Sequence, residues 1–203
     1  MPLLLIILAV ASLSGCLGWL MPADTGVPPK VFGIVNTFPE HPQYIKKKTL
    51  VAGHKVAMVE SISVKNQLTE MVARFLEESG YRAVSVDDRS ALTSGQVDML
   101  IEIVPKKAMN IKGLFACGFS DRKFLLGLVN QPPRSYIGIQ LALSRKNSTR
   151  VVTTRPQGRF SQLNTDMPDT WEALSRREKK RFEANLRENL AKATYLSLKQ
   201  LKI

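Results

Sequence analysis

The chain has 203 residues, of which 44% are hydrophobic and 23% charged. This composition is typical of one globular domain with a short N-terminal addition, large enough to bury a core without disulfides or a structural metal, so we expect no cofactor. The formal net charge of +12 favours anionic partners such as phospholipid headgroups, lipopolysaccharide, nucleic acid or acidic proteins, without choosing among them.

An apolar run opens the chain. Residues 3–13 read LLLIILAVASL and are followed by two small residues and a cysteine, which is the pattern of a secretory signal with its cleavage site. Leu13-Ser14-Gly15-Cys16 resembles the lipobox of bacterial lipoproteins. The resemblance implies that residues 1–15 are a signal peptide and that the Cys16 thiol carries a diacylglyceryl group. Several acyl chains at this cysteine would hold the chain stably on a membrane.

Two further features bear on the location of the chain. In enterobacterial lipoproteins, an aspartate directly after the acylated cysteine resembles an inner-membrane retention signal. This chain has Leu17 at that position, so the resemblance implies the outer membrane, with the domain facing the periplasm. The alternative is a single-pass membrane protein with a basic cytoplasmic domain. Residues 3–21 carry no charge and approach the length of a span, and the lysines at 30 and 46–48 would favour a cytoplasmic C-terminal part.

The glycines and prolines of residues 16–29 indicate a tether, so we expect one domain over 30–203. Its front half predicts strands at 31–35 and 55–60, separated by a loop that contains two prolines. A helix follows, beginning after Ser61 or Ser63 and ending before Gly80. Its apolar face consists of Val64, Leu68, Met71, Val72, Phe75 and Leu76.

The pattern then alternates between strands and turns. We expect a strand at 81–86, a turn or short helix at 88–94, and a half-buried strand at 97–103 that Pro105 terminates. Residues 106–135 are irregular, with a helical piece over 122–129. Alternating apolar residues then predict a hairpin of strands at 137–143 and 150–154.

A long C-terminal helix closes the domain. It starts at Asp169 or at Ser175, of which only the second forms a strict capping box with Glu178. Its apolar stripe, expected to pack on the sheet, is Phe182, Leu186, Leu190, Ala193 and Leu201. Together these elements predict an α/β (α+β) fold, a single mixed sheet packed by helices.

The densest basic run lies in the first turns of that helix and consists of Arg176, Arg177, Lys179, Lys180 and Arg181. Such a run is either a solvated face or a binding surface for an anionic lipid, lipopolysaccharide or an acidic partner. An anion there would offset the repulsion between these charges and the positive end of the helix dipole. Nucleic acid is disfavoured because the basic runs lack interleaved aromatic residues.

Cys117-Gly118-Phe119-Ser120 is identical to the active-site tetrapeptide of monothiol glutaredoxins, in which a helix following the cysteine stabilises the thiolate. The downstream cis-proline motif and glutathione-binding glycine turn of that family have no counterpart. A half-buried single cysteine in a glycine-rich turn is therefore the preferred interpretation, and a thiol-redox protein is the remote alternative. His41 and His54 have no partners at metal-ligand or triad spacing, so we predict no metal site and no catalytic residue.

The block over 75–103, a helix, Gly80-Tyr81, a strand and a second strand after Asp88-Arg89-Ser90, resembles the α/β domains of envelope lipoproteins. These include the curli-secretion lipoprotein and penicillin-binding-protein activators. The resemblance implies a domain that binds partner proteins rather than performing chemistry. We therefore expect a non-catalytic accessory or assembly component of an envelope complex.

Overall fold

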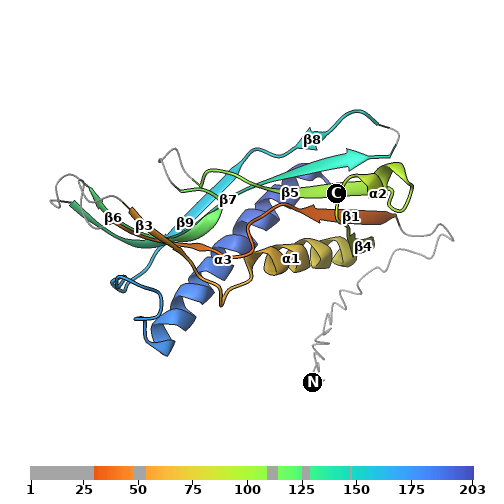
Figure 1. Cartoon of the computed structure of the whole chain (residues 1–203). Helices are drawn as coiled ribbons and strands as arrows, with labels where there is room; N and C mark the ends of the chain where they lie inside the picture. The colour runs from red at the N-terminus through yellow and green to blue at the C-terminus, as the bar shows by residue number, and fades with distance from the viewer. Residues whose placement is uncertain (1–29, 48–53, 109–113, 125–128, 147) are drawn as a thin grey trace, which may run out of the picture.

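The computed structural model describes residues 30–47, 54–108, 114–124, 129–146 and 148–203. Within these ranges the chain forms a mixed sheet curled into a half-barrel and three helices (Figure 1). The predicted α+β class, with a single mixed sheet and a long C-terminal helix, is confirmed. The signal sequence, Cys16, the tether and the alternative span over 3–21 lie outside the described residues.

The described part of the sheet has nine strands in the order β3-β2-β6-β7-β5-β1-β4, with β8 and β9 also paired to β7. Parallel pairs join β1 to β4, β1 to β5 and β2 to β6, and the other pairs are antiparallel. The strands are β1 Val31–Asn36, β2 Gln43–Lys47, β3 His54–Met58, β4 Arg82–Ser85, β5 Met99–Pro105, β6 Cys117–Phe124, β7 Val129–Arg145, β8 Val152–Thr153 and β9 Gln157–Gln162.

The longest strand, β7, spans 17 residues. Its first part pairs with β6 and its second part with β5, so these two strands lie end to end along it. Gly138 occupies the junction: its carbonyl accepts from the Lys106 amide at 2.9 Å, and its own amide donates to the Ala116 carbonyl at 2.6 Å. Residues 106–108 cross the sheet so closely that a Cβ at Gly158 would lie 1.9 Å from the Ala108 carbonyl oxygen.

Helices α1 (Val64–Glu78) and α3 (Arg176–Leu201) cover one face of the sheet, here called the helix face (Figure 1). Helix α1 starts after Ser63, as predicted, and buries four of its expected apolar residues. In α3 the whole predicted stripe is buried, and Ser175 and Glu178 form the capping box. The alternative start at Asp169 is therefore wrong, because Ser175 satisfies the first amides of the helix.

The opposite side of the sheet is here called the outer face. The short helix α2 (Ser90–Thr93) covers part of it, where Ala91 packs with Val35 and Leu100. Ala108 and Leu114 cover another part, where they form a small cluster with Ile45 and Tyr136. Val56 and Phe160 are exposed on this face, and the main core lies between the sheet and the two long helices.

Several sequence predictions were wrong in detail. Strands β2, β6 and β9 were not predicted, and the helical piece over 122–129 is contradicted because its first three residues belong to β6 and Val129 begins β7. Pro105 is the last residue of β5 rather than its terminator, and β8 is a two-residue strand. Among the described residues, no helix combines the length and apolar character needed to cross a membrane.

The apolar stripe of α3 generates a stability prediction. Leu186 is 1% exposed, and Leu186→Asp would place a charge without a partner against the sheet, so we expect a loss of about 4 kcal/mol or outright unfolding. The matched control is Ala184→Asp, an exposed position two residues away, which should cost only about 0.5 kcal/mol of helix propensity. Urea denaturation of both variants measures the difference, and equal losses would contradict the burial of this stripe.

Candidate functional site

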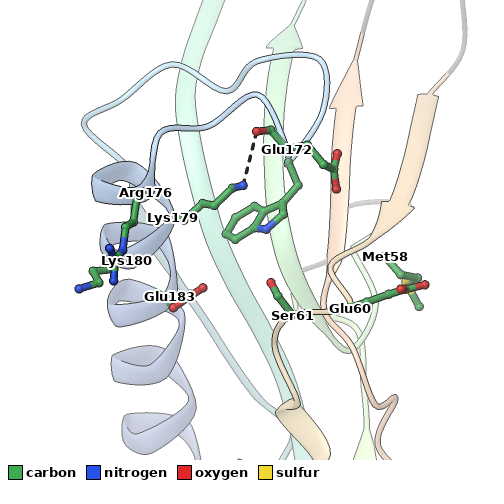
Figure 2. Close-up of a pocket in the computed structure, with 9 residues that line it drawn as sticks. Met58, Glu60, Ser61, Glu172, Arg176, Lys179, Lys180 and Glu183 are labelled. Atoms are coloured by element: carbon green, nitrogen blue, oxygen red, sulfur yellow. Dashed lines mark hydrogen bonds between the residues drawn. The ribbon is translucent and has the colours of Figure 1, made fainter.

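The N-terminal end of α3 forms the wall of an open groove of about 680 Å³. Across the groove lie the end of β3 and the turn after it, and the loop before α3 closes one side (Figure 2). The groove is lined by Met58, Glu60, Ser61, Trp171, Glu172, Arg176, Lys179, Lys180 and Glu183. The first turns of α3 are fixed here because the capping box satisfies the helix end, and Glu178 is the acidic residue of that turn.

Three of the five predicted basic residues line this groove, namely Arg176, Lys179 and Lys180. The Lys179 ammonium lies 3.4 Å from the backbone carbonyl oxygen of Glu172 and donates to it (Figure 2). Arg177 is exposed outside the groove lining. Arg181 is also outside it, with its Nη1 atom 3.3 Å from the Thr165 hydroxyl. The structure therefore divides the basic run instead of gathering it into one site.

Acidic residues share the groove with these cations. Glu60, Glu172 and Glu183 stand among the same lining residues, so the three positive charges are matched by three negative ones. Glu60 comes from the turn after β3, more than a hundred residues before α3, and local sequence patterns gave no sign that it would meet the helix. A groove of mixed charge favours a partner surface that carries both signs over a purely anionic one.

The wall behind the groove is rigid because aromatic rings hold the loop that precedes α3. Trp171 is 5% exposed and stacks on Phe119 at a centroid distance of 5.4 Å, and it meets Tyr44 and Phe182 edge-on, each at 6.1 Å. The Tyr44 hydroxyl donates to the Pro168 carbonyl at 2.7 Å. Burial, assisted by nearby carboxylates, raises the pKa of Tyr44, so this donor stays neutral and the loop stays fastened at physiological pH.

An ion pair beneath the same loop adds a second fastening. The Lys46 ammonium lies 2.7 Å from Asp121, and it also donates to the Met167 carbonyl. Both side chains are largely buried, with 16% and 11% of their surfaces exposed. Lys46 belonged to the lysine cluster that favoured a cytoplasmic domain, and here its charge has a structural partner.

Cys117 is buried in β6, with 0% of its surface exposed. The preferred prediction, a half-buried cysteine in a turn, is therefore wrong in both respects. The helix that the glutaredoxin resemblance required after the cysteine is also absent from the described residues, because β6 continues through Phe124. Burial raises the pKa of the Cys117 thiol, so the thiol stays protonated at neutral pH and lacks the thiolate that redox chemistry requires.

The histidines take no part in the groove. The His41 ring nitrogen Nδ1 lies 3.0 Å from the Ile62 carbonyl oxygen, which ties the loop before β2 to the start of α1. His54 opens β3. Among the described residues, the structure brings together no group of three or more His, Cys, Asp and Glu side chains that could hold a metal ion.

Comparisons with known proteins give a similarity of structure only. No family model matches the chain, and no curated protein matches it. One similar solved structure is a Xanthomonas campestris protein of the DUF330 family, with TM-score 0.46, 13% identity, and coverage of 89% of this chain and 92% of that one. Another is a hypothetical protein from Chlamydia trachomatis, with TM-score 0.41, 7% identity, and coverage of 86% and 96%.

Burial of Cys117 predicts that its thiol is dispensable. Cys117→Ala should leave the domain folded and cost about 1 kcal/mol for a cavity the size of a small group, as measured by urea denaturation. In the unsubstituted protein this thiol should react with a thiol reagent only after denaturant is added. A glutathione-dependent reductase activity that the substitution removes would contradict this and restore the redox alternative.

The helix cap and the basic run should differ in their effects on stability. Ser175→Ala removes the capping box and should lower the free energy of unfolding by about 1 kcal/mol at neutral pH. Hydrogen bonds from the Ser175 side chain and backbone lower the pKa of Glu178, so the capping-box contribution is present above the ordinary pKa of a glutamate. It is lost as the pH falls through the lowered value. The difference between the two proteins should therefore narrow in acid.

The control for Ser175→Ala is a triple variant that combines Arg177→Gln, Lys180→Gln and Arg181→Gln. All three side chains are exposed. We expect a change smaller than about 0.5 kcal/mol in thermal or urea denaturation, since exposed charges contribute little and these oppose the helix dipole. A large loss of stability would mean that the run is structural.

Proposed function

We propose that this protein is a lipid-anchored component of the bacterial envelope that works by binding a partner protein rather than by catalysis. The observation that carries the proposal is the sequence Leu13-Ser14-Gly15-Cys16 after a charge-free apolar run. Acylation of Cys16 would tie the chain to a membrane, and the absence of aspartate at position 17 favours the outer membrane, with the domain facing the periplasm.

The groove beside α3 supports the partner-binding part of the proposal. Met58 is 50% exposed at its border, and Met, Trp and Arg are enriched at protein interfaces. Three cations and three carboxylates line the groove, which would let a partner segment of mixed charge form pairs in one register and not in others. The partner proposed here is therefore a protein segment that carries both signs.

The test of the anchor is Cys16→Ser in the full chain, followed through membrane fractionation and intact-mass measurement. We expect the variant to lose lipid modification and cleavage before residue 16, and with them stable attachment or normal processing. Unsubstituted protein extracted from membranes should show the added mass of acyl groups on a chain that begins at Cys16.

Ser14→Ala is the matched control, because it keeps a small residue next to the cleavage site and leaves the cysteine in place. It should be processed and acylated like the unsubstituted protein. Recovery of Cys16→Ser in the membrane at normal size and yield would overturn the anchor, and would favour the single-pass protein with a cytoplasmic domain.

A further inference from the structure

Most of the net positive charge of this protein falls within residues 103–165, which include β6 to β9 and the segments that connect them. Residues 103–165 contain eleven lysines and arginines but one acidic residue, Asp121, which gives a net charge of +10 out of the +12 of the whole chain. Asp121 is paired with Lys46 on the helix face. The strands and loops from the end of β5 through β9 therefore form a region that attracts anions.

The outer face of five neighbouring strands carries no carboxylate in two described rows. Residues opposite one another in register point to the same face, and the pairings of β3, β2, β6, β7 and β9 define both rows. The first row is Val56, Ile45, Ser120, Arg134 and Gln162. The second row is Met58, Gln43, Gly118, Tyr136 and Phe160.

Large apolar side chains on this face are open to solvent. Val56 is 53% exposed at the β3 edge, and Phe160 is 45% exposed on β9. Phe115, two residues before β6, is also 45% exposed. Five strands at about 4.8 Å spacing set the β3 and β9 rows about 19 Å apart. The apolar residues are thus spread over a broad surface.

Cations accompany these apolar groups. The Arg134 guanidinium carbon lies 5.2 Å from the centre of the Phe160 ring. The exposed Lys107 forms an isolated antiparallel β-bridge with Phe115. Aromatic and aliphatic side chains next to lysine and arginine, without carboxylates, are the combination that suits the headgroup region of an anionic bilayer. In the α3 groove, by contrast, cations and carboxylates occur in equal numbers.

We propose that the outer face, defined by Val56, Phe115, Phe160, Lys107 and Arg134, docks on anionic phospholipid. The proposal rests on the proposed function in one respect, because the anchor at Cys16 would hold the domain beside that lipid. Charge complementarity supports the choice of an anionic bilayer. The apolar groups spread across five strands favour a broad interface over a single narrow peptide. The α1 and α3 side of the domain would then face away from the bilayer.

The experiment uses the full chain extracted from membranes and reconstituted into vesicles. A fluorophore is attached to a cysteine introduced by Gln162→Cys, an exposed position of the first row, and lipid-borne nitroxide quenches it on contact. The comparison site is Glu77→Cys, an exposed position of α1 on the helix side. Protein without an introduced cysteine is labelled in parallel, and its signal is subtracted. One set of vesicles contains phosphatidylcholine alone, and the other contains 30% phosphatidylglycerol, about one lipid in three.

We expect strong quenching at position 162 in the phosphatidylglycerol vesicles. This quenching should be weaker in vesicles of phosphatidylcholine alone and at high salt. Position 77 should stay unquenched in both. Lys107→Gln should reduce the docked population about fivefold, the effect of one cation near an anionic surface, and Phe160→Gln should reduce it as well. The matched controls are Tyr195→Gln, an equally exposed aromatic residue on α3, and the combined Arg177, Lys180 and Arg181 substitution, neither of which should change it.

Other outcomes would overturn the proposal. Equal quenching at position 162 in both vesicle types would remove the role of charge. If only the combined Arg177, Lys180 and Arg181 substitution abolished quenching, the contact with anionic lipid would be made by α3 and not by the outer face. Crosslinking of Gln162→Cys between chains in place of quenching would assign this face to a second copy. The anchor is judged separately by the mass at Cys16, so docking without acylation, or acylation without docking, distinguishes the two failures.

Discussion

The fold depends on one long strand that four others share. Strand β7 spans 17 residues, and its pairings with β5, β6, β8 and β9 leave the chain no freedom to slip, because a shift by one residue would move every side chain to the other face. Gly138 makes the arrangement feasible: a Cβ there would lie 2.3 Å from the Lys106 carbonyl oxygen. Residues 106–108 can therefore cross the outer face at this glycine, and the Ala116 carbonyl accepts from the amide of the same residue.

Polar contacts on the helix face fix how α3 sits on that strand. The Asn189 amide donates to the Ser135 hydroxyl at 2.7 Å, while its oxygen accepts from Ser161 at 2.8 Å. One residue thus joins α3 to both β7 and β9. Buried polar groups are costly without partners, so a helix shifted by one turn would lose these bonds as well as its apolar contacts. The same rigidity holds the N-terminal end of α3, and with it the groove, in one position relative to β3.

The features predicted correctly from the sequence are those that depend on residues close together in the chain. The stripe of α3, the capping box and the alternation through Ile137 and Leu143 are local periodic patterns, and they were predicted correctly. Strand β9 is an edge strand whose residues are mostly exposed, and Gly118 and the paired Asp121 interrupt alternation in β6, so neither showed the period. The contiguous basic run of α3 was conspicuous, but its acidic neighbour Glu60 is remote in sequence. The two rows of the outer face that lack carboxylates depend on strand register, which local patterns do not reveal.

An anchor changes how strong a binding surface has to be. Thirteen residues separate Cys16 from the start of the domain at Lys30, a reach of at most about 50 Å when extended, whereas a domain of this size has a radius of gyration of about 16 Å. Any face of an anchored domain could therefore reach the bilayer. An anchored domain meets that bilayer at an effective concentration in the millimolar range, so a contact of about 4 kcal/mol suffices to populate the docked state. Three exposed apolar side chains and a few cations can supply that much, and the same surface on an untethered chain would leave it largely free in solution.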